Sequence, residues 1–447
     1  MKKFFCKLIV ALAFPLFGGC SYDNGSSANP PSGFTAAAGD GRVVLTWAPD
    51  ANVDYWLFTA TDPSLTAFVW TNLPNSHAFP SAVSPYYMCG LLDDTEYWFA
   101  INGRIGGGAG GPSSATISAT PYKTGSTWIA NALLIQNVLS PNLYGAGYAS
   151  LATCSNNTTS ASGSFAAVGA NGAIFTSADG TNWVSRLAPP GFSSDLYAVA
   201  GYAANLNNPL NPALRWVAVG AGGVSLYSVD GITWAIGRDL ATASNLPNPS
   251  LRSLTEFAGR FFAAGDTGTI LSSTDGITWI PHTSGTTNNL NGVTHGSIYV
   301  AVGDNGTILT SLDGNIWTTQ ASGTANNLRQ VSSVGKIYVA VGDAGTIVTS
   351  KDGGATWAVT TLPGAPNLSG VAAEFRHDTS VVPDPLLGFI PNAQFVAIDS
   401  AGNTYTSPNG ITWSGATSTG ASNLNALVSS GFGYVAAGNA GVTLTSF

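Results

Sequence analysis

The stretch "YVAVGDAGTIVTS" (Tyr338–Ser350) repeats, with two substitutions, the stretch "YVAVGDNGTILTS" (Tyr299–Ser311). Five further copies of this phrase occur along the chain, and six of the seven copies are followed by a tryptophan: Trp183, Trp234, Trp279, Trp317, Trp357 and Trp413. Successive tryptophans lie 38 to 56 residues apart. A period in this range is typical of radial β-architectures in which each repeat forms one four-stranded sheet.

Each copy reads as strands joined by tight turns. In the second phrase above, "YVAVG" is a short apolar strand, and "DNG" is a turn in which Gly306 supplies a positive φ. The β-branched "TILTS" is the next strand, an Asp-Gly pair marks a second turn, and the tryptophan opens a further strand. A short segment with leucine as its second residue precedes every copy, as in "NLNGV" with Leu290. Seven such segments and seven phrases predict seven four-stranded sheets.

The last repeat lacks its tryptophan. Its phrase "YVAAGNAGVTLTSF" ends at Phe447, whereas "TGSTW", ending at Trp128, matches the tail of a repeat without the front half. We expect the C-terminus to supply three strands of the last sheet and residues 124–135 to supply the fourth, because this closure leaves no open sheet edge. The alternative is that Trp128 is incidental. The prediction for residues 122–447 is therefore an all-β, seven-bladed β-propeller.

The turn before each tryptophan resembles the Asp-box, or BNR repeat, of sialidases, sortilin-type propellers and photosystem II assembly-factor-like proteins. The fit is close in "SADGTNW", "SVDGITW", "STDGITW" and "SLDGNIW", whereas "SKDGGATW" has one extra residue and "SPNGITW" carries Asn409 in place of the aspartate. The resemblance implies a structural role for the box, in which the aspartate accepts local backbone N–H bonds and the tryptophan packs between blades. The structural Asp-box residues are then Asp179, Asp230, Asp275, Asp313 and Asp352.

The front of the chain predicts export and a lipid anchor. Residues 1–19 combine early lysines with a short apolar stretch, as a signal peptide does, and this stretch is too short for a permanent transmembrane helix. "FGGC" resembles the lipobox of bacterial lipoproteins, although Phe17 stands where leucine is usual. We expect lipidation at Cys20, with ordinary signal-peptide cleavage as the alternative, and a flexible tether over residues 20–30. By family analogy, Ser21 permits transfer to the outer membrane or cell surface.

Residues 31–121 resemble a fibronectin type III domain. "RVVLTW" alternates Val43, Leu45 and Trp47 inward, and Leu91 and Tyr97 stand where that family has its tyrosine corner. Processing would leave two cysteines besides Cys20. A disulfide between Cys89 and Cys154 suits an oxidising compartment, and Cys89 as a small buried hydrophobe is the alternative.

The amino-acid composition limits the classes of partner that the protein can be expected to bind. Only 9% of residues are charged, and loss of three signal-peptide lysines leaves 12 basic residues against 23 acidic ones, a net charge of about −11. Such a surface is poorly suited to nucleic acid or anionic lipid. Contact with a membrane is therefore expected through the lipid anchor only.

No catalytic constellation stands out. The Arg-Ile-Pro motif of sialidases is absent from the repeats, and their two glutamates, Glu256 and Glu374, follow no recognisable nucleophilic tyrosine. The histidines show no metal-ligand spacing, and no cofactor is expected. We expect a non-catalytic protein. The rival class is a secreted glycan-active hydrolase, sialidase-like or glucanase-like, which needs converging carboxylates or three clustered arginines.

What remains is recognition of a partner. In propellers of this kind, the loops that enter the innermost strands share one face with the turns between second and third strands. That face should display the residues just after the repeated leucine, which include Tyr144, Tyr197, Arg252 and Arg329, and the turn residues Asp266, Asp304 and Asp343. For the three aspartates, capping of the Asp-x-Gly turns is the alternative role. The expected partner is an envelope or extracellular protein or glycan.

Overall fold

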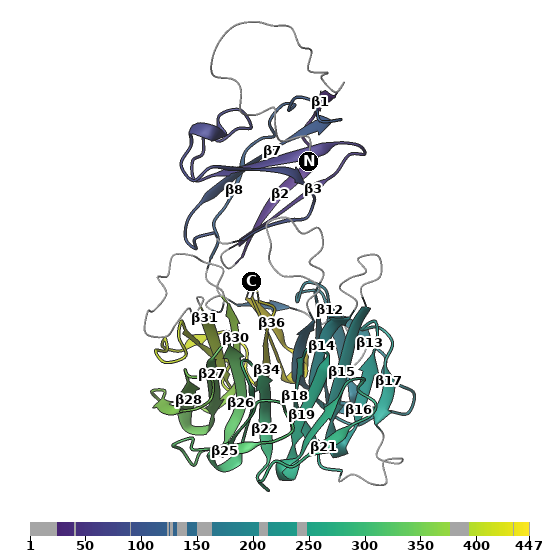
Figure 1. Cartoon of the computed structure of the whole chain (residues 1–447), viewed down its shortest axis with the longest axis vertical. Helices are drawn as coiled ribbons and strands as arrows, with labels where there is room; N and C mark the ends of the chain where they lie inside the picture. Colours follow the sequence, from purple (N-terminus) through teal and green to yellow (C-terminus); the bar gives the residue numbers. More distant parts are fainter. Residues whose placement is uncertain are drawn as a thin grey trace, which may run out of the picture. The chain divides into compact units, whose positions relative to one another are not determined.

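The computed structural model describes residues 25–39, 42–89, 91–122, 125, 128–131, 141–149, 163–204, 213–238, 248–375, 393–431 and 433–446. These residues form an all-β protein whose only helices are three-residue 3₁₀ turns, and no helix among them is long and apolar enough to cross a bilayer. The predicted signal peptide, Cys20 and Cys154 lie outside the described residues. By their contacts, the residues divide into two compact units, the first comprising residues up to 34, 47–84 and 97–118, and the second comprising the rest. Figure 1 shows that the regular secondary structure of the described parts of the chain consists almost entirely of strands.

The first unit contains a sheet with the strand order β1-β7-β4-β5, and β8 also pairs with β7. Its strands are β1 (Ser26–Ala28), β4 (Asp54–Ala60), β5 (His77–Ala82), β7 (Tyr97–Ile105) and β8 (Ile117–Ala119). A 3₁₀ turn, η1 (Trp70–Asn72), packs on a small core around Phe58 and Leu65. Trp47 and Tyr55 meet edge to face and are both buried.

The second unit also contains most residues of a three-stranded sheet. It has the order β2-β3-β6, and its strands are β2 (Ser32–Gly39), β3 (Arg42–Ala48) and β6 (Tyr86–Cys89). Val43 and Leu45 on β3 are fully buried, as the alternation in the sequence predicts.

The remainder of the second unit consists of four-stranded antiparallel sheets, seven of them among the described residues. The first strand of every sheet begins at a repeated leucine: β10 (Leu143–Ala149), β14 (Leu196–Ala204), β18 (Leu251–Phe257), β22 (Leu290–His295), β26 (Leu328–Val334), β30 (Leu368–Phe375) and β34 (Leu424–Ser429). The second strands are β11 (Ser164–Gly169), β15 (Ala213–Gly220), β19 (Arg260–Gly265), β23 (Tyr299–Gly303), β27 (Ile337–Gly342), β31 (Ala393–Asp399) and β35 (Tyr434–Gly438).

Tight turns lead from the second strands to the third. Six of them are 3₁₀ turns: η2 (Ala170–Gly172), η3 (Ala221–Gly223), η4 (Asp266–Gly268), η5 (Asp304–Gly306), η6 (Asp343–Gly345) and η7 (Asn439–Gly441). The third strands are β12 (Ile174–Ser177), β16 (Ser225–Ser228), β20 (Ile270–Ser273), β24 (Ile308–Ser311), β28 (Thr346–Ser350), β32 (Asn403–Ser407) and β36 (Thr443–Ser446). The fourth strands are β13 (Val184–Arg186), β17 (Ala235–Arg238), β21 (Ile280–His282), β25 (Thr318–Gln320), β29 (Ala358–Thr361), β33 (Thr417–Ser418) and β9 (Ile129–Asn131).

The core lies between successive sheets. All seven leading leucines are at most 1% exposed, and the second strands are almost continuously buried apolar runs such as "YVAVG" at Tyr299–Gly303. Clusters of buried side chains join neighbouring sheets; one of them links Phe262 on β19 with Leu290 and Ala301 of the next sheet. This burial explains why the second strand is the best-repeated part of each unit.

The turn between third and fourth strands has a repeated hydrogen-bond pattern. In the first sheet, Asp179 Oδ1 accepts the backbone N–H of Thr181 (2.9 Å) and of Asn182 (2.7 Å). Gly180 N–H donates to Ser177 Oγ (2.8 Å), and Trp183 Nε1 donates to the carbonyl oxygen of Gly180 (2.7 Å). The carboxylates at the same position of the next four sheets, and the amide oxygen of Asn409, accept the corresponding pair of backbone N–H groups.

The last sheet joins the two ends of the repeat region. Its order is β34-β35-β36-β9, and β9 pairs antiparallel with β36 through Ile129 and Thr445, Ala130 and Leu444, and Asn131 and Thr443. The turn is completed across the chain: Gly125 N–H donates to Ser446 Oγ (2.7 Å), and Trp128 Nε1 donates to the Gly125 carbonyl (3.1 Å). Gly125 and Trp128 of "TGSTW" therefore hold the places of the glycine and tryptophan of a repeat tail.

Candidate functional site

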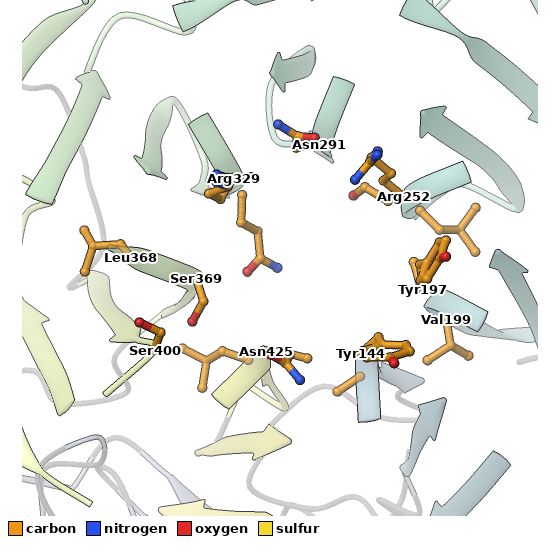
Figure 2. Close-up of a pocket in the computed structure, with 18 of the residues that line it drawn as sticks. Tyr144, Tyr197, Val199, Arg252, Asn291, Arg329, Leu368, Ser369, Ser400 and Asn425 are labelled. Atoms are coloured by element: carbon orange, nitrogen blue, oxygen red, sulfur yellow. The ribbon is translucent and has the colours of Figure 1, made fainter. Parts of the chain in front are cut away.

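A cavity of about 570 Å³ opens where the first strands begin. Each of the seven first strands contributes the residue that follows its buried leucine. We call these residues the bulge ring: Tyr144, Tyr197, Arg252, Asn291, Arg329, Ser369 and Asn425. Figure 2 shows them around the cavity in chain order.

The bulge ring owes its geometry to a repeated backbone irregularity. In all seven sheets the pairing register between first and second strands shifts immediately after the leucine, so the next residue has no partner in the ladder. Such a β-bulge bends the strand and re-aims the side chain of the extra residue, and bulges are common beside active sites. The leucine holds the start of each strand in the core, whereas the bulged residue is tyrosine, arginine, asparagine or serine in different sheets.

The structure brings most of the predicted face together. Tyr144, Tyr197, Arg252, Arg329 and Asp343 line this one cavity. Three other members of the bulge ring are not among the site residues predicted from the sequence: Asn291, Ser369 and Asn425. Their position after the repeated leucine was the signal that could have found them.

A second set of residues backs the bulge ring from the turns that follow the second strands. Within the third sheet, Arg252 Nε forms an ion pair with Asp266, and within the fifth, Arg329 binds both oxygens of Asp343 at 2.9 and 2.8 Å. In the fourth and seventh sheets an amide replaces the guanidinium: Asn291 Nδ2 donates to Asp304 Oδ1 (2.8 Å), and Asn425 Nδ2 donates to Asn439 Oδ1 (2.8 Å).

The tyrosines have different neighbours. The turns of their two sheets begin with alanine, Ala170 and Ala221, where the other turns carry an acceptor. The rings of Tyr144 and Tyr197 lie 5.8 Å apart between centroids and are tilted by 54°. Burial, together with the nearby Asp195, raises the pKa of Tyr197 above its ordinary value. The cavity therefore has an aromatic side and a side of paired polar groups.

The positive charges of the two guanidinium groups at the cavity are balanced by carboxylates. Each pairs with the aspartate of its own sheet, and the side chains of Arg252 and Arg329 are 43% and 44% exposed. The hydrogen bond from Arg329 to Asp343 raises the pKa of the guanidinium further, so the guanidinium keeps its charge at neutral pH. Of the predicted aspartates, Asp266 and Asp343 thus bind the arginines, and Asp304 accepts amide groups. All three are also the first residues of their turns.

The turns are also held by the sheet that follows them. The backbone N–H of Thr267 donates to Asn289 Oδ1, that of Asn305 to Asn327 Oδ1 and that of Ala344 to Asn367 Oδ1, each at 3.0 Å. The same bond joins the N–H of Ala440 to Asn142 Oδ1 (3.1 Å), so it links the last sheet to the first. These cross-sheet bonds fix the turns before any ligand arrives, which is the condition for a preorganised site.

The two glutamates considered for catalysis lie elsewhere. Glu256 accepts the N–H of Gly259 in the hairpin between β18 and β19, and burial raises its pKa. Glu374 is 3% exposed and accepts Ser429 Oγ (2.7 Å) and the N–H of Gly433 (3.1 Å). Neither residue lines the cavity, and within the described residues no three His, Cys, Asp or Glu side chains are grouped as metal ligands.

Comparisons with known proteins bear on the fold. The sequence model of a family described as "DUF6242 beta propeller domain" matches residues 216–327. The repeats form a β-propeller. No curated protein sequence matches the chain.

Solved structures resemble this propeller at low sequence identity. YCF48 bound to D1 peptide superposes with a TM-score of 0.53 at 17% identity, covering 73% of this chain and 98% of YCF48. YCF48 from Cyanidioschyzon merolae gives 0.49 at 17% identity, with coverage of 72% and 98%. The WD40 β-propeller domain of Doa1 gives 0.50 at 8% identity, with coverage of 72% and 97%. At these identities the likeness concerns the fold alone.

Proposed function

We propose that this chain is a non-catalytic binding protein of the cell envelope, and that the bulge ring binds an extracellular or envelope protein or glycan. One observation carries the proposal. Seven structurally equivalent, bulged positions converge on one cavity, and they carry four kinds of polar or aromatic side chain. A rigid scaffold that varies its residues at one face is the usual design of a recognition site.

The chemistry of the cavity favours binding over hydrolysis. A glycosidase needs two carboxyl groups across a cleft, one of them able to donate or accept a proton. Asp343 at the cavity is held in a two-oxygen contact with Arg329, and Asp304 accepts two amide groups. YCF48, a similarly folded protein, has been solved bound to D1 peptide, so a propeller of this fold can bind a polypeptide.

The finer architecture belongs to the same proposal. We infer that the seven sheets are blades of one closed ring, because first strands contact one another in chain order and β34 contacts β10. The bond from Asn425 Nδ2 to the carbonyl oxygen of Leu143 (2.8 Å) supports this closure. We also propose that residues 31–121 are a fibronectin type III-like domain, supported by the burial of Trp47 and Tyr97.

Affinity capture with a variant tests the binding role. The mature protein is immobilised and exposed to a native envelope extract, in parallel with a variant carrying Tyr144→Ala, Tyr197→Ala, Arg252→Ala and Arg329→Ala. The control is Leu312→Ser, since Leu312 is 85% exposed and lies at the opposite end of a third strand from the cavity side. We expect a protein or polysaccharide that the wild type and the control retain and the ring variant loses. Equal retention by all three proteins, or hydrolysis of envelope glycans that requires Glu256 or Glu374, would refute the proposal.

The anchor has its own test. We propose that Cys20 carries lipid and holds the protein at the outer membrane or cell surface. More than one acyl chain is needed for stable attachment, and a lipoprotein cysteine supplies them. Cys20→Ala should release the protein from the membrane fraction or leave it unprocessed, and normal processing with unchanged membrane association would contradict the anchor.

A further inference from the structure

We propose that the bulge ring takes a neutral oligosaccharide rather than a charged ligand or a peptide. This inference rests on the binding role proposed above and deepens it by naming the ligand class. Three features of the cavity favour this ligand class: its charge balance, its aromatic side and its paired donors and acceptors.

The charge balance disfavours anions. The described charged residues that line the cavity are Arg252, Arg329 and Asp343, and Asp266 lies directly behind the first of them. Both arginines are therefore compensated within their own sheets. An anionic ligand would have to compete with Asp266 and Asp343 for the guanidinium groups, and it would approach two like charges. A neutral ligand meets no such penalty.

The aromatic side suits a sugar ring. Tyr144 and Tyr197 are the largest apolar groups that line the cavity, and they stand on adjacent strands with their centroids 5.8 Å apart. The face of an aromatic ring carries negative charge density, so it attracts polarised C–H groups such as those on one face of a pyranose. Two neighbouring rings offer such contacts to two successive sugar units.

The polar side suits hydroxyl groups. Each hydroxyl both donates and accepts hydrogen bonds. Two sheets offer a donor beside an acceptor, in the pairs Arg252–Asp266 and Arg329–Asp343. In the sheet between them, Asn291 donates both N–H groups, to Asp304 and to the Leu328 carbonyl, so that sheet offers the Asp304 carboxylate as an acceptor. A vicinal diol can accept from guanidinium N–H groups that Arg252 or Arg329 does not use in its ion pair, and it can donate to the carboxylate of the same pair. The hydroxyl oxygen of Ser369 and the amide oxygen of Asn425 add further acceptor atoms round the ring.

A peptide would need a different cavity. The affinity of protein interfaces comes mainly from a few large side chains that fill well-packed pockets. Of the branched aliphatic side chains that line this cavity, Val199, Leu368 and Leu427 are only 4%, 1% and 3% exposed, and Leu254 alone is partly exposed. The exposed apolar surface is then dominated by the two tyrosine rings.

Calorimetric titration with defined probes tests the assignment. The probes are hexasaccharides of glucose, mannose and N-acetylglucosamine, the anionic hexamer of galacturonic acid, and a mixture of neutral hexapeptides. We expect at least one neutral hexasaccharide to bind. Tyr144→Ala with Tyr197→Ala should weaken it about tenfold or more, because stacking on two rings is lost. The corresponding double Phe variant should stay within about threefold, and so should the control Tyr122→Ala, which is 38% exposed and outside the cavity.

A second variant pair tests the charge balance. Asp266→Asn with Asp343→Asn leaves the arginines without their carboxylates, and we expect it to increase binding of the galacturonate hexamer. If no neutral sugar binds at millimolar concentration, or if wild type prefers galacturonate or the peptides, the sugar assignment is wrong. Binding of peptides that is lost in the tyrosine variant would still support the ring as a binding site. Insensitivity of every captured partner to the ring variants would overturn both proposals.

Discussion

Each Asp-box aspartate acts on the backbone next to it. Hydrogen bonds, first from the backbone N–H of Asn315, lower the pKa of Asp313 from 3.8 to about 2. Burial would raise the pKa of Asp352, but hydrogen bonds led by the Thr356 side chain lower it, also to about 2. A carboxylate whose pKa is depressed on folding stabilises the fold above its unfolded pKa, and this contribution is lost as the pH falls through the folded value. The relevant window is from about pH 4 to about pH 2.

The test is a comparison of melting temperatures against pH. The double variant Asp313→Asn and Asp352→Asn keeps acceptors for the backbone N–H groups, as Asn409 does naturally, but cannot titrate. We expect a gap in melting temperature between wild type and variant that is constant above pH 4 and narrows toward pH 2. A gap that does not change with pH would show that the box charges do not contribute.

At the scale of the element, the turns between second and third strands place one residue in the left-handed region. Asn171 and Asn305 hold this position at φ of 54°, and Thr267 adopts the same angle. Asparagine tolerates this conformation, whereas a β-branched residue is strained in it. We therefore expect Thr267→Asn to raise the free energy of unfolding by about 0.5–1 kcal/mol, since the strain is relieved while the cross-sheet bond from the N–H to Asn289 is kept.

The reciprocal change serves as a matched control. Asn305→Thr places the strained residue in the next sheet, in the same backbone conformation, and should destabilise the protein by a similar amount. Denaturant unfolding monitored by tryptophan fluorescence measures both variants. Stability changes of equal sign in the two variants would show that strain at this position is not the cause.

At the scale of the whole molecule, the last sheet needs both ends of the repeat region. β36 is bonded on one side to β35 and on the other to β9, and Ser446 completes the turn that begins at Gly125. Deleting residues 442–446 would remove a central strand and leave two open edges, which favour aggregation. We expect the deletion variant to lose its cooperative thermal transition, whereas Leu312→Ser should melt like the wild type. A deletion variant that still melts cooperatively at the wild-type temperature would contradict this dependence.

Much of the fold could be predicted from the sequence, because its causes are local. Each repeat can be identified from its turn residues, its β-branched strand and its tryptophan, and "TGSTW" indicates the tail that the last repeat lacks. The face that carries Tyr144, Tyr197, Arg252 and Arg329 was also predictable, since all four follow the repeated leucine. The sequence by itself determined how many four-stranded units to expect and which residues share a face.

Only the tertiary structure decided how those residues act together. Arg252 and Asp266 are 14 positions apart, as are Arg329 and Asp343, and it is the strand register that makes them ion pairs rather than isolated charges. The bulge after each leucine is likewise a property of pairing with the second strand, and it adds Asn291, Ser369 and Asn425 to the ring. The sequence shows which charged residues the chain has. Whether their charges balance in this cavity depends on which side chains the sheets bring into contact.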